Sequence, residues 1–464
     1  MPASAVAIFA VVVVAYVSQS HRLERVHVTA PIVFTAVGAV FGLVVARAGA
    51  DATLVRGLAE GTLALVLFHD AAQVQPRQLR REAGLCVRLL LLGLPLTMLA
   101  GFVTARLLFP DAGVWLALLL AAALAPTDAG LGAATVLHPA VPAQVRRVLN
   151  VESGLNDGLA TPVVLFAIAA ATTLPGEEVA LEESALRELA IGLLAGILLG
   201  IACGRLLSWA FHRRLVHADL LPVATLAVPL LTYYGSVALH GNGFVAAFVS
   251  GTAFAAAAGR PIGVRPGRAG AEAALEPGHP AGSGHEAGSE PPAMPRQQEV
   301  LQLVEWVSVI LGYAVWTLFG VVAVAHLGQV FTWPGLLFAV LSLTVLRMAP
   351  VALVLLGTGL RRRTVLFIGW FGPRGLASVV FALLAVESLS AGPGPGAVIG
   401  AIATTVLLSV VLHGITADPW ARAYGRWVSV ERPSVELAGS VEPVAGRGHP
   451  RGRPRGLAGG LPSR

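Results

Sequence analysis

The chain has 464 residues, of which 56% are hydrophobic and only 12% are charged. A soluble domain carries about 25% charged residues, so this composition excludes a soluble globular protein. The formal charge is +6, but the basic residues are almost all arginines in predicted loops, which indicates orientation in a membrane rather than binding to nucleic acid.

Apolar stretches of roughly 20 residues recur along the chain, without the alternation typical of barrel strands. We therefore predict an all-α polytopic membrane protein with about thirteen transmembrane helices, arranged as an inverted-repeat antiporter fold with interrupted helices in its core. Numbered in chain order, the predicted segments are 4–18, 28–47, 55–71, 85–109, 113–137, 146–171, 187–211, 219–239, 242–258, 301–327, 332–358, 364–390 and 396–417.

Arginine distribution predicts the orientation of these segments. Arginines are concentrated in the loops that follow segments 1, 3, 5, 7, 9 and 11, whereas the loop after segment 6 is acidic. The positive-inside rule then places the N-terminus outside the cell membrane and the C-terminus in the cytoplasm.

Two stretches lack the apolar character of the rest. Residues 259–300 are rich in Gly, Pro, Ala and charge, which predicts a flexible cytoplasmic linker between a first membrane half, 1–258, and a second membrane part, 301–417. Residues 418–464 are predicted to be a disordered basic cytoplasmic tail, either simply solvated or in contact with anionic lipid headgroups.

Segment 6 contains the polar stretch VESGLNDGLATP at 151–162. Ionisable groups are costly inside a membrane and usually mark a transport pathway. Ser153 and Asp157 are four residues apart and share a helix face with Asn156 nearby, whereas Glu152 lies about 140° around the helix from Asp157. The stretch therefore indicates an ion pathway, with a buried structural hydrogen-bond cluster as the alternative.

Segment 5 contains LAPTDAGLGAATV, in which Thr127 and Asp128 directly follow Pro126. Proline removes a backbone donor and the glycines weaken the helix, so we predict an interrupted helix here. Such breaks leave free carbonyls that bind ions in transporters. A simple proline kink beside an incidental aspartate is the alternative interpretation.

Segment 12 carries a second break, in GWFGPRGLASVV, where Arg374 lies mid-span between glycines and a proline. A buried arginine must pair with a carboxylate or with free helix-end carbonyls, and we expect Glu152 to be its partner. The alternative is that Arg374 extends to the membrane interface. Breaks at corresponding places in two halves predict an inverted-repeat transporter with a site at the midplane.

Other polar residues in the segments have less specific interpretations. Arg347 in segment 11 either pairs with Asp128 or lies near the ion site, and extension to the interface is equally compatible with its position. Asp70, at the end of segment 3, either lines an access funnel or terminates the helix. The histidines near segment ends lack metal-ligand spacing and are interpreted as interfacial: His69, His138, His240, His326 and His413.

Three motifs in this order resemble the cation:proton antiporters of the NhaP and mammalian sodium/proton exchanger type: Thr127–Asp128 after a proline, LNDG at 155–158, and GPRGLASVVFAL at 372–383. The resemblance covers about residues 5–420. It implies that Asp157 carries the cation or the proton, and that Ser153 and Thr127 help to coordinate the ion.

The resemblance also implies that Glu152 pairs with Arg374, that Arg347 matches a basic residue of the family's eleventh helix, and that the protein is a homodimer with a moving core domain. Two departures leave ion selectivity open. Ala129 follows Asp128 where the family often has proline, and Asp70 stands where some members have glutamate.

We therefore expect a secondary active transporter, not an enzyme, that exchanges one monovalent cation for one proton by competition at Asp157. The cation, Na⁺ or alternatively K⁺ or Li⁺, is expected to bind oxygens of Asp157, Ser153 and Thr127, with Asp128 and Asn156 completing the site. No resident cofactor is expected, and the expected partners are membrane lipid, cations, protons and a second copy of the chain. An intramembrane aspartyl protease using both aspartates, or a passive channel, is the alternative.

Overall fold

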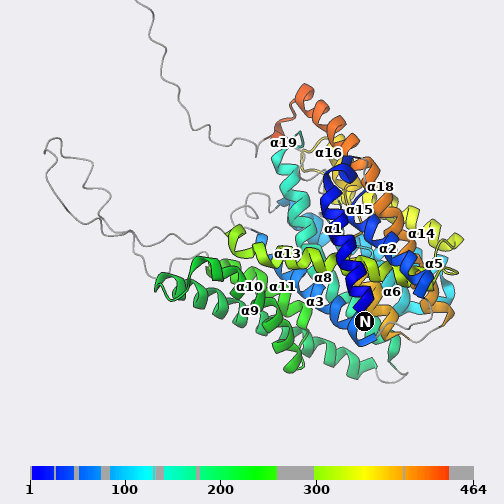
Figure 1. Cartoon of the computed structure of the whole chain (residues 1–464). Coiled ribbons are helices and arrows are strands. Elements are labelled where there is room, and N and C mark those ends of the chain that lie inside the picture. The colour runs from blue at the N-terminus through cyan, green and yellow to red at the C-terminus, as the bar shows by residue number, and fades with distance from the viewer. Residues whose placement is uncertain are drawn as a thin grey trace, which may run out of the picture.

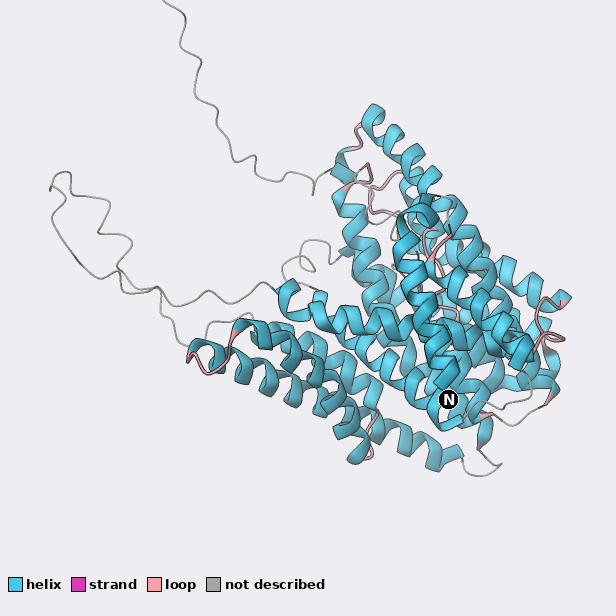
Figure 2. Cartoon of the chain, in the orientation of Figure 1, coloured by secondary structure: helices cyan, strands magenta, loops and turns pink. Residues whose placement is uncertain are grey.

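The computed structural model describes residues 3–25, 28–45, 52–74, 84–128, 131, 140–173, 178–258, 297–389 and 392–437. Across these ranges the protein is helical and contains no β-strand, which confirms the predicted all-α class (Figure 2). Most of the predicted linker (259–296) and the end of the predicted tail (438–464) lie outside the described residues.

The helices follow the predicted segments closely (Figure 1). The first part of the chain contains α1 (Ala3–Arg25), α2 (Ala30–Val45), α3 (Ala52–Gln73), the π-helical turn η1 (Arg88–Gly93), α5 (Leu94–Leu108), η2 (Pro110–Ala112), α6 (Gly113–Ala123), α8 (Ala143–Thr172), α9 (Glu178–His212), η3 (Ala218–Leu220), α10 (Leu221–Ala238) and α11 (Gly243–Ala258). The second part contains α13 (Gln297–Ala325), α14 (Trp333–Leu343), α15 (Val345–Val354), α16 (Arg362–Trp370), α17 (Leu376–Ser388), α18 (Pro393–Glu431) and α19 (Ser434–Leu437).

Eight helical stretches of the described chain are long and apolar enough to cross a membrane, and four shorter apolar helices accompany them. The helix α3 belongs to neither group, and it carries Arg56, Glu60 and Asp70. Each of the thirteen predicted segments contains at least one described helix. The chain is thus a multi-pass membrane protein, and the number of crossings stays a prediction.

Glycines allow the closest helix contacts in the bundle. Along α9 a glycine recurs every fourth residue from Gly192 to Gly204, and each faces the backbone of α11 or of Asn242 just before it. A Cβ atom at Gly196 would lie 2.6 Å from the carbonyl oxygen of Ala246, and one at Gly200 would lie 2.7 Å from that of Ser250. Small residues at this spacing let two helices approach until their backbones touch, which is a common device for packing in lipid.

Three segments are interrupted in the middle of the bundle. Segment 5 leaves the helix after Ala123, and segment 12 is non-helical from Phe371 to Gly375 between α16 and α17. These two breaks confirm the predictions from their Gly and Pro residues. Segment 11 is also broken, at Thr344 between α14 and α15, where the backbone φ and ψ angles are −117° and −92°. The sequence analysis did not predict this third break.

The prediction that residues 418–464 are disordered is wrong for residues 418–437. The helix α18 continues beyond its predicted end at 417 to Glu431, and α19 follows it. This extension rises out of the bundle beside α16 (Figure 1). Its aromatic side chains explain its order, because Trp420 stacks on Trp370 and Tyr424 stacks on Phe367 of α16.

The glycine contacts predict that α9 does not tolerate a larger side chain at Gly196. Gly196→Leu places a side chain against the backbone of α11, and overpacking of this kind costs about 1–3 kcal/mol. We expect a lower melting temperature and less monodisperse protein after detergent extraction, measured by fluorescence-detected size-exclusion chromatography. The matched control is Gly57→Leu, since a Cβ atom at Gly57 meets no atom within 4 Å. Equal losses in both variants would contradict this account of the packing.

Candidate functional site

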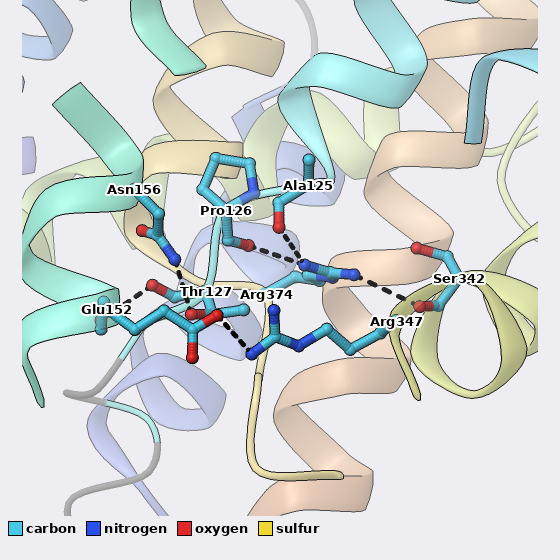
Figure 3. A network of polar contacts seen from close by, with 9 residues as sticks. Ala125, Pro126, Thr127, Glu152, Asn156, Ser342, Arg347 and Arg374 are labelled. Carbon is cyan, nitrogen blue, oxygen red and sulfur yellow. Dashed lines mark hydrogen bonds and ion pairs between the residues drawn. The ribbon is translucent and has the colours of Figure 1, made fainter. Parts of the chain in front are cut away.

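Arg374 lies at the centre of the bundle, where the broken segments cross, and its side chain is 0% exposed. Its Nη1 donates to the carbonyl oxygens of Ala125 at 2.6 Å and Pro126 at 2.9 Å, and its Nη2 donates to that of Ser342 at 3.3 Å (Figure 3). These carbonyls lie at the C-terminal ends of α6 and α14, which carry partial negative charge. The arginine therefore caps two interrupted helices, and it does not extend to the interface.

The predicted ion pair between Glu152 and Arg374 is wrong, because Glu152 pairs with Arg347. Arg347 Nη2 lies 2.6 Å from Glu152 Oε1, and the two side chains are only 2% and 3% exposed (Figure 3). Arg374 instead donates to backbone carbonyl oxygens that lie at the breaks of segments 5 and 11. Arg347 is three residues beyond the unpredicted break at Thr344 and points toward α8, so its alternative pairing with Asp128 is not realised either.

Asp128 caps the start of α17. Its Oδ2 accepts the N–H of Leu376 at 2.9 Å, and its own N–H donates to the carbonyl oxygen of Pro373 at 2.8 Å. A carboxylate is favourable at a helix N-terminus, where the unpaired N–H groups carry partial positive charge. Gly375 makes this approach possible, since a Cβ atom there would collide with the Asp128 carboxylate.

Two polar side chains of α8 bind the non-helical stretch that follows α6. Ser153 Oγ donates to the carbonyl oxygen of Thr127 at 2.8 Å, and Asn156 Nδ2 donates to the Thr127 hydroxyl at 2.7 Å. All three side chains are buried, and Asn156 Oδ1 is buried without a hydrogen-bond partner. The structure thus brings Thr127, Ser153 and Asn156 together, as their motifs predicted.

Asp157 lies one residue beyond Asn156 and is only 7% exposed. Its carboxylate accepts no hydrogen bond from any of the described residues, although it lies within electrostatic range of Asp128 and Asp70. An ionised carboxylate is costly to bury without donors or a counter-charge. An ionised Asp157 would therefore be uncompensated by the described residues around it.

Glycines bring two further helices against Asp157. A Cβ atom at Gly158 would collide with the ring of Phe248 on α11, and one at Gly154 would lie 3.5 Å from Asp70 on α3. The Asp70 side chain is 33% exposed, and its Oδ1 lies 3.4 Å from His69 Nδ1. Asp70 is therefore part of the same neighbourhood but is more accessible to solvent than Asp157.

Oxygen atoms predominate among the polar groups around Asp157. In the described part of the chain, no group of three or more His, Cys, Asp or Glu side chains is arranged to hold a metal ion. The groups around Asp157 are carboxylate, hydroxyl, amide and carbonyl oxygens, which suit hard cations rather than transition metals.

A cavity of about 720 Å³, which the sequence analysis did not predict, lies beside α8 one turn beyond Gly158. Its walls include Pro162 on α8 and Phe244 on α11, and its polar groups include Arg56 and Glu60 of α3. Arg56 Nε lies 2.7 Å from Glu60 Oε1. The spacing of Arg56 and Glu60, four residues apart on a helix, was the available signal for this pair.

Two sequence comparisons both find similarity to sodium/proton exchangers. The sequence profile described as "Sodium/hydrogen exchanger, transmembrane" matches residues 8–263 and 292–423. A Na(+)/H(+) antiporter of Schizosaccharomyces pombe is 34% identical over 139 residues, which are 28% of this chain and 29% of that protein. The chain thus matches less than a third of that relative's length.

Solved structures resemble the whole fold. The sodium proton antiporter MjNhaP1 from Methanocaldococcus jannaschii at pH 8 superposes with a TM-score of 0.67 at 18% identity, over 90% of this chain and 98% of that one. An electron-microscopy structure of MjNhaP1 gives a TM-score of 0.63 at 16% identity, over 93% and 99% of the two chains. At such identities the likeness shows the fold alone.

The ion pair between Glu152 and Arg347 predicts a specific pattern of stability. Glu152→Gln or Arg347→Gln leaves one buried charge unpaired, which costs on the order of 3–5 kcal/mol. The double variant removes both charges, so we expect it to recover part of the loss in thermal unfolding measurements.

The surface pair of Asp418 and Arg422 on α18, whose side chains are 28% and 62% exposed, provides the control for this cycle. The same substitutions there should change stability by about 0–1 kcal/mol, since solvent screens both groups. Strictly additive losses for Glu152→Gln and Arg347→Gln would show that the two side chains do not stabilise each other.

Proposed function

Because this chain belongs to the transmembrane sodium/hydrogen exchanger family, we propose that it is a secondary transporter that exchanges Na⁺ for protons across the membrane. K⁺ and Li⁺ are the alternative cargoes, since all three ions bind oxygen ligands. The observation that carries this proposal is the isolated, buried carboxylate of Asp157 beside two crossing broken helices.

The charge balance of the core supports exchange at one group. Two guanidinium groups, Arg347 and Arg374, lie among three carboxylates, Glu152, Asp128 and Asp157. With all five ionised, the core carries one net negative charge in a low-dielectric environment. One Na⁺ or one proton neutralises this charge, and both together would leave an uncompensated positive charge.

The roles of the individual carboxylates follow from their partners. Glu152 is bound to Arg347, and the Asp128 carboxylate is bound to the N-terminus of α17. Only Asp157 has neither a cation nor a donor among the described residues. Asp157 is thus the group at which the cation and the proton compete.

The surrounding oxygens complete a cation site. The Ser153 hydroxyl, the Thr127 carbonyl and hydroxyl, and the unpartnered Asn156 Oδ1 all lie beside the break of segment 5. These groups replace part of the hydration shell of an alkali ion. Asp128 contributes its charge nearby, while Asp70, which is more exposed, offers a first contact for ions that approach from solvent.

Competition at one carboxylate makes the exchange obligatory if empty Asp157 does not cross the membrane. One carboxylate binds either one Na⁺ or one proton, so the proposed stoichiometry is 1:1 and electroneutral. Alternating access would come from motion of the core helices against the rest of the bundle. We further propose a homodimer in the cell membrane, with the N-terminus outside and the C-terminus in the cytoplasm.

The other candidate functions have less support. An aspartyl protease would need Asp128 and Asp157 free to activate a shared water, but the Asp128 carboxylate is bound to the N–H of Leu376. A passive channel would need a continuous polar path, whereas Ser153, Asn156 and Glu152 are held in hydrogen bonds and an ion pair with the broken segments.

The first test removes the proposed carrier. Asp157→Asn keeps the size of the side chain but holds neither a charge nor a titrating proton, so we expect Na⁺-driven proton movement in proteoliposomes to fall to background. A pH-sensitive dye inside the vesicles reports the exchange, and the exposed Asp219→Asn provides the control. Exchange at the unmodified rate in Asp157→Asn would refute the assignment.

The second test addresses competition and charge. If one proton competes with one Na⁺, the apparent KM for Na⁺ should rise about tenfold for each unit of falling pH in the acidic range. The rate should also be insensitive to an imposed membrane potential. A KM that does not change with pH contradicts competition, and a potential-dependent rate contradicts 1:1 exchange.

A further inference from the structure

We propose that His413, acting with Ser409, is a positioning residue of this transporter: it caps the carbonyl end of α16 and so fixes the break that carries Arg374. The inference rests on the proposed antiport, because it concerns the side chains that keep the broken segment in its ion-binding geometry.

The contacts of His413 do not fit the interfacial role expected from sequence. The side chain projects from α18 into the bundle and is only 1% exposed. Its Nε2 lies 2.9 Å from the carbonyl oxygen of Trp370, the last residue of α16. This carbonyl has no partner within α16 but accepts the N–H of Gly372 at 2.8 Å, and the imidazole N–H is its second donor, from α18.

The second ring nitrogen connects His413 to the other end of the break. Nδ1 lies 3.3 Å from the hydroxyl oxygen of Ser409 and 2.9 Å from its carbonyl oxygen. The Ser409 hydroxyl in turn accepts the backbone N–H of Arg374 at 2.7 Å. When the ring hydrogen is on Nε2, that nitrogen donates to the Trp370 carbonyl and Nδ1 accepts the hydroxyl hydrogen of Ser409.

Two side chains one turn apart on α18 therefore bind the backbone near both ends of the non-helical stretch, at Trp370 and at Arg374. Within this stretch, the Phe371 N–H donates to the carbonyl oxygen of Phe367 and the Gly372 N–H donates to that of Trp370 at 2.8 Å. The Arg374 N–H and the Pro373 carbonyl instead bind Ser409 and Asp128, so the later part of the break depends on partners from other segments.

His413 completes a set of caps around the crossing. Asp128 caps the start of α17, and Arg374 caps the ends of α6 and α14. His413 caps the end of α16, the remaining helix end at the break of segment 12. A shift of that break would move the Arg374 guanidinium from its carbonyls and Leu376 from Asp128, and both contacts border Thr127 in the ion site.

Other contacts hold α16 against α18 independently of His413. Trp370 Nε1 donates to the Thr416 hydroxyl at 3.1 Å, and the Trp370 and Trp420 rings stack with their centroids 5.1 Å apart. We therefore expect a His413 variant to fold with α16 in place but with the break less well fixed.

The test compares three variants in proteoliposomes, with rates expressed per molecule of folded transporter. His413→Leu fills the space but removes the donor by which α18 holds the Trp370 carbonyl, so we expect about a tenfold higher KM for Na⁺ or a tenfold lower rate. His413→Gln retains an N–H near the position of Nε2 and should restore most of this loss. Ser409→Ala combined with His413→Leu should be little worse than His413→Leu alone, because both act through the same break.

Thr405→Val is the matched control, since the buried Thr405 hydroxyl lies two turns away on α18 and donates only to Ala401 of its own helix. It should exchange like the unmodified protein. A His413→Leu protein with unchanged KM and unchanged rate per folded molecule would overturn the inference, even if less of it folds, as would failure of His413→Gln to improve on it. An unmodified protein without exchange would instead overturn the proposed function, and this inference with it.

Discussion

The structure depends on how the buried guanidinium of Arg374 is compensated. Three carbonyl oxygens from the ends of two broken helices surround it, so its charge stabilises helix ends rather than a single carboxylate. Asp128 places a negative charge at the start of α17, where the unpaired N–H groups carry partial positive charge. A crossing of helix ends inside lipid would otherwise expose unpaired backbone groups, each at a cost of several kcal/mol. The two charged caps make the crossing possible and leave Asp157 as the carboxylate of this core that has no partner among the described residues.

Much of the fold was predictable from the sequence, because its physical causes are local. Apolar length predicts helices, and Gly and Pro predict the breaks near Pro126 and Pro373, since both effects act within a few residues. The break at Thr344 has no such local signal. The helical extension to Glu431 was also missed, since its order comes from aromatic contacts with α16, far away in the sequence.

The site was predictable to a similar degree. The motifs correctly brought Thr127, Ser153 and Asn156 together, because two polar positions on one helix face meet one break. The partner of Glu152 was wrong, since the choice between two buried arginines depends on where carbonyls become free. Backbone acceptors carry no residue identity, so a sequence does not reveal that they bind Arg374. The role of His413 was hidden for the same reason, because its main partner is a carbonyl.

The central claim is that the core carries one negative charge that Na⁺ and H⁺ neutralise in turn. Isothermal titration calorimetry of the purified protein tests it most directly, with Na⁺ added in buffers of different ionisation enthalpy at a pH where Asp157 is protonated. The account predicts that close to one proton is released for each Na⁺ bound, and that Asp157→Asn releases none. Saturable binding of Na⁺ to the unmodified protein without proton release would contradict it.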